Sequence, residues 1–477
     1  MTEFNGATAV VFFCYALIML GIGWRASRKT HSSEDFFLAD RSFKSWVTAI
    51  GSTASSESAW AVLGTAGMAY KDGLSVFWFL PGCLLGYALN WFFIAERLRK
   101  ASRDSKAVTL PDYFQHYFND SSHTLRIIFV VIIFSCMMAY IAAQLTAIGK
   151  TFDAVFGISH TLSIPVGTAV IIGYTMSGGF RAVAWTDFVQ GIIMACGLFL
   201  LTVVAICALD GFSGMMQKVN EADPTALTWM GGKTFSAFMG TAVGLLGIGL
   251  GYPGQPHVLN RYMAAKDERT IRIGVWIALG WGLTMYSSAI LLGICGKALF
   301  PGLKDAEHLF PLAAQNLLPS FLAAIVLTGV LAAIMSTVSA QIIVAASTMA
   351  HDVYARIFKL EAPPQTIVRI SRASVLILGL GSCLIALGET RVIFWFVLFA
   401  WSGLGASFGP LILCTLYSKN VTRSGAIAGM VTGFAVTIIW KITGLSESLI
   451  YELPPAFLLS FLAVCIFNKK PASTEPI

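Results

Sequence analysis

The feature that most restricts the fold of this sequence is the recurrence of apolar stretches long enough to cross a bilayer, about 20 residues as a helix. Thirteen stretches qualify, some only when Gly and Ser are counted within them. Charged residues make up 12% of the 477 residues, against roughly 25% in a soluble domain. The longest gaps, about 20 to 28 residues, are too short for an ordinary soluble domain. We therefore expect an all-α polytopic membrane protein with about thirteen transmembrane helices, over residues 7–24, 44–70, 74–96, 124–149, 160–178, 186–209, 235–259, 271–296, 316–350, 371–388, 392–417, 424–440 and 448–467.

The distribution of Lys and Arg tests that count independently, because basic residues collect in the cytoplasmic loops of membrane proteins. When the segments between stretches are taken alternately, one set holds 24 of the 32 Lys and Arg and the other holds 8. This asymmetry predicts a multi-pass protein of a bacterial inner (plasma) membrane, with the N-terminus outside and the C-terminus in the cytosol. The net charge of +7 comes from these short clusters, so it does not indicate nucleic-acid binding.

The nine cysteines and the first apolar stretch fit the same interpretation. All nine Cys lie inside apolar stretches, without a CxxC motif or a Cys/His pair at metal-ligand spacing, and we interpret them as packing residues. The stretch 7–24 has no basic segment before it and no A-x-A site after it. It is therefore predicted to be a retained helix and not a signal peptide.

Two of the stretches are poor helix formers, and they lie five stretches apart. Residues 51–59 are rich in Ser and Thr, which compete for backbone hydrogen bonds, and residues 247–256 contain four Gly and two Pro. Interrupted helices at matching positions are typical of transporters built from inverted repeats, in which the solute binds at the breaks. The predicted division is an extra first helix and cytosolic loop (1–43), a first repeat (44–209), a second repeat (235–417), and two extra helices with a short cytosolic tail (418–477). The alternative is two kinked helices without function, since Gly and Pro are common in membrane helices.

Glu57 lies near the middle of the second stretch, where a charged side chain is costly and is a functional hypothesis by default. A lone carboxylate there could serve a cation, a proton or a cationic group of a solute. An unpaired carboxylate at that depth requires a partner. The candidates are the amine of the solute, a tyrosine hydroxyl, or a basic group that the sequence does not identify. A purely structural role, such as capping a half-helix, is the alternative.

Hydroxyl and carboxylate side chains occur in two further stretches. Ser336 and Thr337 share a helical face with small residues in the ninth stretch, and hydroxyls are hard oxygen ligands for a small cation, although such residues ordinarily serve helix packing. Asp187 follows Trp185 and Thr186 near the start of the sixth stretch, where a helix cap is the competing interpretation. We find no nucleophile elbow, Walker loop, dinucleotide fingerprint or H-E-x-x-H motif, so we do not expect an enzyme.

Four segments at these positions resemble the sodium:solute symporter family, most closely its sodium/proline symporters. They are Thr109-Leu-Pro-Asp-Tyr-Phe114, Trp185-Thr-Asp-Phe-Val-Gln190, Gly254-Gln-Pro-His257 and Met335-Ser-Thr-Val-Ser-Ala-Gln341, and the likeness runs in order from about residue 35 to the thirteenth stretch. Membership would imply the five-plus-five inverted-repeat fold of the leucine-transporter type. It would also imply uptake of a small organic solute coupled to sodium, which is co-transported and not a resident cofactor.

The resemblance assigns roles residue by residue. It implies a sodium site formed by backbone carbonyls of Ala54, Glu57 and Ala333 with the hydroxyls of Ser336 and Thr337. It also implies that Asp187 handles sodium on the cytosolic path. A second sodium site would need hydroxyls at Ser339 and Ala340, and Ala340 has none.

The expected solute pocket departs from the proline pattern of the family. Proline carriers have Asp where this chain has Ser56, Met where it has Glu57, and Trp where it has Ile248. The residues expected to line the pocket are Ser56, Glu57, Ser58, Trp60, Tyr140, Gln144, Tyr252, Gln255 and Pro256.

We therefore expect a sodium-coupled secondary active symporter for a small organic solute, most simply proline or another amino acid or zwitterion. The alternatives are a solute-sensing membrane protein of the same fold, or a symporter for betaine or choline or for an organic acid. The expected partners are the solute, sodium and the lipid bilayer, without nucleic acid or an obligate protein partner.

Overall fold

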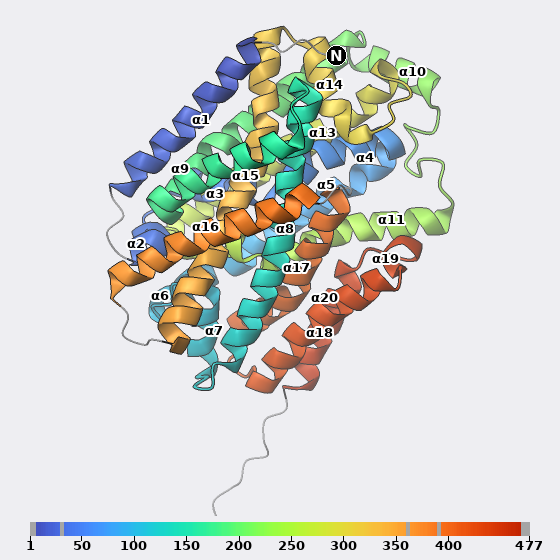
Figure 1. Cartoon of the computed structure of the whole chain (residues 1–477). Helices are drawn as coiled ribbons and strands as arrows, with labels where there is room; N and C mark the ends of the chain where they lie inside the picture. Colours follow the sequence, from blue (N-terminus) through green and yellow to red (C-terminus); the bar gives the residue numbers. More distant parts are fainter. Residues whose placement is uncertain (1–5, 29–32, 359–362, 389–392, 469–477) are drawn as a thin grey trace, which may run out of the picture.

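The computed structural model describes residues 6–28, 33–358, 363–388 and 393–468. Within these ranges the chain is helical, and its one β pairing is an isolated bridge between Phe43 and Ala265. Figure 1 shows the helices packed side by side, with α18 and α20 adjacent at one edge and α1 at the other. The predicted all-α class is confirmed.

The helices follow one another with short connections, and η marks short 3-10 or π segments. From the N-terminus they are α1 (Gly6–Ser27), α2 (Ser33–Leu38), η1 (Ala39–Arg41), α3 (Ser45–Ser56), η2 (Trp60–Gly64), α4 (Thr65–Asp72), η3 (Gly73–Trp78), α5 (Phe79–Ala88), η4 (Leu89–Ala95), α6 (Glu96–Asp104), α7 (Leu110–Phe118), α8 (Thr124–Phe156), α9 (His160–Ala208) and α10 (Gly211–Ala222). They continue with α11 (Phe235–Gly247), η5 (Ile248–Gly254), α12 (Pro256–Met263), α13 (Glu268–Leu299), η6 (Ala306–His308), α14 (Leu309–Leu317), α15 (Ser320–Ser347), η7 (Thr348–Phe358), α16 (Pro364–Gly388), α17 (Ile393–Tyr417), α18 (Arg423–Ile442), α19 (Leu445–Ser448) and α20 (Leu453–Ile466).

Ten helical runs in the described ranges are long and apolar enough to cross a membrane. Two of them each contain parts of two predicted stretches. Trp60–Asp104 covers the end of 44–70 and all of 74–96, and His160–Ala208 covers 160–178 and 186–209. The last predicted stretch corresponds to a shorter apolar helix, Leu453–Ile466. The protein is thus a multi-pass helical membrane protein, and the count of thirteen stays a prediction.

Gly179 is where the 49-residue helix α9 changes direction. Its dihedral angles (φ 58°, ψ −149°) are not helical, and a Cβ atom there would lie 2.7 Å from the Phe36 ring. A residue with a side chain would be strained at this positive φ, which glycine adopts freely. Gly179 therefore separates two helices at the boundary that the sequence predicts between the fifth and sixth stretches.

Both helix interruptions expected from composition are present. α3 ends at Ser56, and Glu57 follows in an extended conformation (φ −98°, ψ 108°) before the chain turns into a helix again at Trp60. The second interruption follows η5, where Gln255 is extended (φ −88°, ψ 106°) and α12 begins at the next residue. The two breaks meet inside the bundle, because α12 packs on α3 while α5 and α17 both pack on η5.

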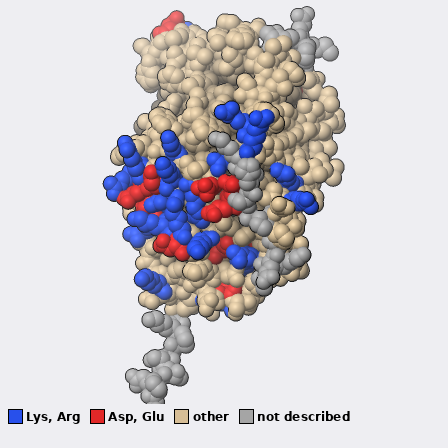
Figure 2. Space-filling model, turned by 90° about the vertical axis from the view of Figure 1, so that its left-hand side faces the viewer, with Lys and Arg blue, Asp and Glu red and all other residues tan. Residues whose placement is uncertain are grey.

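The first half of α1 and the end of α20 lie near opposite ends of α8, which at 33 residues is about 50 Å long. The segment before α8 contacts the start of α18 through Asp120 and Arg423 (3.4 Å), and α20 finishes at the same end because the backbone N–H of Thr422 donates to Asn468. At the other end the ring of Phe12 in α1 stacks on a ring near the end of α8. Lys and Arg side chains gather over the middle and lower part of the face in Figure 2, and few lie above it.

Candidate functional site

Four of the oxygens predicted to bind sodium lie together where the end of α3 meets the middle of α15. The hydroxyl of Ser336 is 3.0 Å from the carbonyl oxygen of Ala54 and 3.0 Å from that of Ala333. The hydroxyl of Thr337 is 3.1 Å from the same Ala333 oxygen. All four residues are completely buried. Carbonyl oxygens at the end of a half-helix are a recurring way to coordinate Na⁺ in transporters, so the donor set fits the ion.

The carboxylate of Glu57 lies among tyrosine hydroxyls. Its Oε1 atom accepts hydrogen bonds from Tyr252 (2.6 Å), from Tyr87 (2.8 Å) and from the adjacent Ser56 (3.2 Å). The hydroxyl of Tyr286 lies 2.8 Å from that of Tyr252 and donates to that of Tyr87 (3.3 Å). We call Tyr87, Tyr252 and Tyr286 the tyrosine cage. Tyrosine hydroxyls, one of the three candidate partners considered from the sequence, are thus hydrogen-bond partners of Glu57. Its Oε2 atom has no hydrogen-bond partner in the described chain.

The polar residues predicted to line the solute pocket lie on α8 and at the two breaks. The side-chain carbonyl of Gln144 accepts from the backbone N–H of Ala59, and the side-chain amide of Gln255 donates to the carbonyls of Gly251 and Trp401. Several buried polar atoms here form no hydrogen bond within the described chain, namely the Ser58 and Tyr140 hydroxyls, the Gln144 Nε2 atom and the Gln255 Oε1 atom. Unsatisfied buried groups are costly, which makes this cluster a candidate ligand site. Pro256 begins α12 directly beside it.

Aromatic rings pack against one another around these polar atoms. Trp60 packs edge-on against Phe79, with centroids 5.4 Å apart, and lies 6.3 Å from Trp401. Trp401 also packs on Tyr252 (4.8 Å), and its indole N–H donates to the carbonyl of Ile248. Sequence reasoning missed Trp401, as it missed two members of the tyrosine cage, Tyr87 and Tyr286. These residues stand inside mostly apolar stretches whose few polar residues form no pattern that points to a site.

Asp187 lies within α9, past the turn at Gly179, and not at a helix start. It forms an ion pair with Arg261 of α12, and both side chains are completely buried. The guanidinium lies over the Phe180 ring (4.7 Å), and the ring and α3 enclose it, since a Cβ on Gly51 would be 3.3 Å from its Nη1 atom. Arg261 is therefore the partner that the sequence did not identify for Asp187. Ser339 lies on α15, where its hydroxyl donates to the carbonyl of Ser336, and Ala340 adds no ligand.

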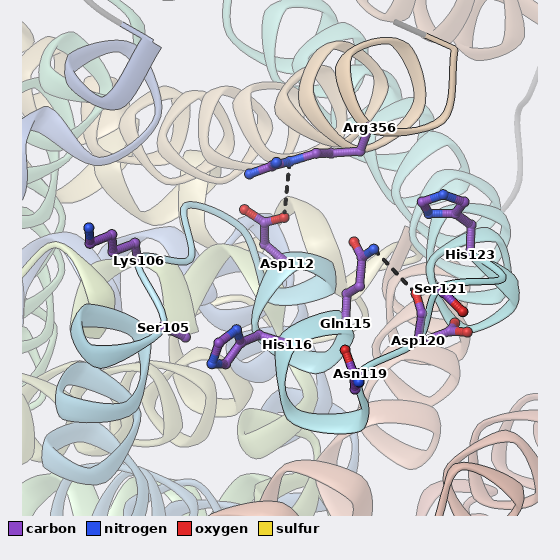
Figure 3. Close-up of a pocket in the computed structure, with 10 residues that line it drawn as sticks. All are labelled: Ser105, Lys106, Asp112, Gln115, His116, Asn119, Asp120, Ser121, His123 and Arg356. Carbon is purple, nitrogen blue, oxygen red and sulfur yellow. Dashed lines mark hydrogen bonds and ion pairs between the residues drawn. The ribbon is translucent and has the colours of Figure 1, made fainter. Parts of the chain in front are cut away.

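A second polar region lies at the end of the molecule where α7 meets η7. Its pocket of about 350 Å³ is shown in Figure 3. The lining side chains carry both signs of charge: Ser105, Lys106, Asp112, Gln115, His116, Asn119, Asp120, Ser121, His123 and Arg356. None of the residues predicted to bind sodium or solute is among them.

Behind this pocket Arg126 is buried between two carboxylates. It pairs with Asp112 (2.8 Å) and with Asp352, while His351 lies 2.9 Å from Asp112. Burial raises the pKa of Asp112, but the contacts with His351 and the charge of Arg126 outweigh it and hold that pKa well below its usual value. Thr109, from the Thr-Leu-Pro-Asp motif, caps α7 and also donates to Asp352 (2.9 Å). The motif therefore ties α7, α8 and η7 together and contributes no predicted ligand.

Comparison with known proteins gives matches over nearly the whole chain. The model of the sodium:solute symporter family matches residues 36–433. An osmoregulated proline transporter of Bacillus subtilis is 35% identical over 97% of this chain and 95% of its own length. A sodium/proline symporter of Salmonella typhimurium is 35% identical over 96% of this chain and 92% of its own length.

Solved structures share the fold at lower identity. A Na⁺-coupled sialic acid symporter in a substrate-bound outward-open state superimposes with a TM-score of 0.81 at 19% identity, covering 98% of both chains. MhsT in complex with L-phenylalanine gives a TM-score of 0.54 at 11% identity, covering 88% of this chain and 97% of that one. These likenesses confirm a leucine-transporter-type helical fold.

Proposed function

Because the chain belongs to the sodium:solute symporter family, and is therefore a sodium-coupled transporter and not an enzyme, we propose that its solute is proline or another amino acid of similar size. The observation that carries this proposal is the set of unsatisfied polar atoms at the helix breaks. It agrees with the names of the relatives, which are proline transporters at 35% identity.

The polar atoms suit the two charged ends of an amino acid. The hydroxyls of Ser58 and Tyr140 and the side-chain NH₂ of Gln144 can donate to a carboxylate, while the free Oε1 of Gln255 can accept from an ammonium group. Trp60 and Tyr252 supply apolar faces for the rest of the solute, and such contacts are worth about 0.5 to 1.5 kcal/mol each. The proposed solute-binding residues are Ser56, Glu57, Ser58, Trp60, Tyr140, Gln144, Tyr252, Gln255 and Pro256.

The proposed sodium site consists of the carbonyl oxygens of Ala54, Glu57 and Ala333 and the hydroxyls of Ser336 and Thr337. The short distances among four of these groups support it. Sodium bound here would bridge the broken helix α3 and the continuous helix α15. This is the contact through which an ion gradient can act on a solute site at the same break.

We further propose that Asp187 lies on the cytosolic path of sodium and that the chain comprises two five-helix repeats over residues 44–209 and 235–417. In the proposed orientation the N-terminus is outside and the C-terminus is in the cytosol. The position of α1 and α20 at opposite ends of α8 supports opposite sides for the two termini. Reporter tags at the two ends, tested for accessibility in intact cells, would contradict this orientation if both were protected from outside.

The proposed function is tested by uptake of labelled proline into proteoliposomes under an inward sodium gradient. We expect accumulation above the external concentration, loss of accumulation when potassium replaces sodium, and competition by the amino acids that fit the pocket. Competition from betaine, choline, organic acids and sugars in the same assay identifies the solute class. Binding without accumulation would contradict transport, and uptake driven by a pH gradient without sodium would contradict the coupling ion.

A further inference from the structure

Glu57 is a buried carboxylate whose negative charge has no cationic partner in the described chain. Its hydrogen-bond donors are hydroxyls, and it forms no ion pair there with Lys, Arg or His. Three hydroxyl groups donate hydrogen bonds to Oε1, while the buried Oε2 has no hydrogen-bond partner among the residues that the structure describes. Burying an ionised carboxylate costs several kcal/mol unless a charge of opposite sign is nearby. If Glu57 is ionised, its charge therefore requires a cation from outside the described chain.

The backbone around Glu57 adds partial negative charge to this region. The residue is the C-cap of α3, and the C-terminal end of a helix carries a partial negative charge that favours cations and disfavours anions. The carbonyl of Ala54 belongs to the same last turn of α3 and accepts a hydrogen bond from Ser336 of α15. A negative helix end and an unpaired carboxylate together form a strongly cation-attracting environment.

The proposed sodium site shares a residue with this carboxylate. The backbone carbonyl of Glu57 is one of its expected ligands, and only the Cα, Cβ and Cγ atoms separate that carbonyl group from the carboxylate. Accepting the proposed sodium site, we infer that the Glu57 carboxylate is the fixed counter-ion of the co-transported sodium and that the tyrosine cage is an anion-binding site which holds it in place.

The composition of the cage supports this inference. Tyr87 comes from α5, Tyr252 from η5 and Tyr286 from α13, so three separate elements present hydroxyl groups to one point. Hydroxyl donors satisfy an anion without contributing a full positive charge of their own. The anion therefore stays electrostatically available to the sodium ion, which an Arg or Lys partner would prevent.

The amine of the solute is the competing partner for Glu57. The unsatisfied donors of Tyr140 and Gln144 lie on α8, whereas the cage lies on α5, η5 and α13. The hydrogen bonds from the cage and from Ser56 are made to Oε1, so only Oε2 remains to reach a solute. If Glu57 binds the amine, replacing it should weaken solute binding. If Glu57 is the counter-ion, replacing it should weaken sodium binding.

The inference predicts that a small inorganic anion can replace the carboxylate. In a Glu57→Ala variant the hydroxyls keep their positions on three helices, and the space vacated by the carboxylate opens between them. Chloride should bind there and restore the negative charge. In Glu57→Gln the neutral amide fills the same space, so chloride should have no effect.

The test measures binding of ²²Na⁺ to purified protein without solute, in sodium chloride or in sodium gluconate. Wild type should bind sodium equally in both media. Glu57→Ala should bind sodium at least tenfold more weakly in gluconate, with most of that loss recovered in chloride, whereas Glu57→Gln should be equally weak in both. Adding Tyr87→Phe to Glu57→Ala should reduce the recovery by chloride.

Glu452 offers a matched control, since it is another buried glutamate held by a hydroxyl, that of Ser402 (3.3 Å). Glu452→Gln should leave sodium affinity and its independence of chloride unchanged, and a chloride effect in this control would overturn the assignment. If Glu57→Ala does not fold, Glu57→Gln still decides. A sodium affinity within twofold of wild type, with weakened solute binding, would refute the counter-ion role in favour of the amine. Failure of wild type to accumulate any solute with sodium would instead refute the proposed function.

Discussion

Removing one partner of the pair between Asp187 and Arg261 should destabilise the protein more than removing both. Both side chains are completely buried, and two of the three nitrogen atoms of the guanidinium and one carboxylate oxygen already lack hydrogen bonds within the described part of the chain. In Arg261→Gln the carboxylate of Asp187 would remain in the bundle without its cation. In Asp187→Asn the guanidinium would be left in the same position.

The expected loss of stability follows from the complete burial of both side chains. Breaking a buried ion pair by removing one partner costs about 3 to 5 kcal/mol, whereas replacing the whole pair by neutral groups is often close to neutral. With an unfolding entropy of roughly 2.1 cal/mol/K per residue, a chain of this length loses about 1 °C of melting temperature for each kcal/mol. We therefore expect either single variant to melt about 3 to 5 °C below wild type. The double variant Asp187→Asn with Arg261→Gln should melt above at least one of them.

The assay is thermal unfolding of the four purified proteins in one detergent, sodium-free, with the coupling energy taken from the double-mutant cycle. Contacting residues give coupling energies of about 0.5 to 3 kcal/mol, and independent sites add within about 0.3 to 0.5 kcal/mol. Additive losses within that margin would refute the claim that Arg261 neutralises Asp187. Losses below about 1 °C in the single variants would show that water or another group solvates the pair.

Three further outcomes can be checked on the same preparation. Replacing both Ser336 and Thr337 by Ala should raise the sodium concentration for half-maximal transport at least tenfold with normal expression, and an unchanged value would mean that they only pack. Gly179→Ala should lower the melting temperature by about 1 to 3 °C, because the positive φ costs about 1 to 3 kcal/mol in a non-glycine residue, and an unaltered melting curve would contradict the role of the glycine. The pKa of Asp223 is lowered to about 2, chiefly by its hydrogen bond to Lys297, so its stabilisation is present above the unfolded value near 3.8 and is lost as pH falls through about 2. Asp223→Asn should therefore lower the free energy of unfolding by less than about 1 kcal/mol, as is usual for a partly exposed ion pair. The loss should be the same at pH 8 and at pH 5, and a loss that differed between these pH values would contradict the lowered pKa of Asp223.

The parts of the fold that depend on local composition could be predicted from the sequence. Ser and Thr around Glu57, and Gly and Pro before Pro256, destabilise helix wherever they occur, so both breaks were placed correctly without knowledge of neighbouring helices. The face shared by Ser336 and Thr337 is likewise a property of one helix. Both inferences use only the periodicity and propensity of a single segment.

Contacts between distant segments could not be predicted in the same way. The tyrosines around Glu57 follow it by 30, 195 and 229 positions, and only Tyr252 stands in a segment that its composition makes conspicuous. Arg261 is 74 positions from Asp187. In an apolar stretch a tyrosine that supports a carboxylate and a tyrosine that merely packs have the same local pattern, and the three-dimensional arrangement alone distinguishes them.

If sodium binds at the proposed site, the hydrogen bond from Ser336 to the carbonyl of Ala54 makes that binding an exchange reaction. These two oxygens form a hydrogen bond between α3 and α15, 3.0 Å apart. To coordinate sodium, the hydroxyl must turn its proton away and both oxygens must direct lone pairs at the ion, so each binding event begins by breaking a helix–helix bond. The measured sodium affinity then reflects the free energy of coordinating the ion less the free energy of the hydrogen bond that the same two oxygens lose. Substitutions that only change how closely α3 approaches α15 should alter sodium affinity without touching a ligand.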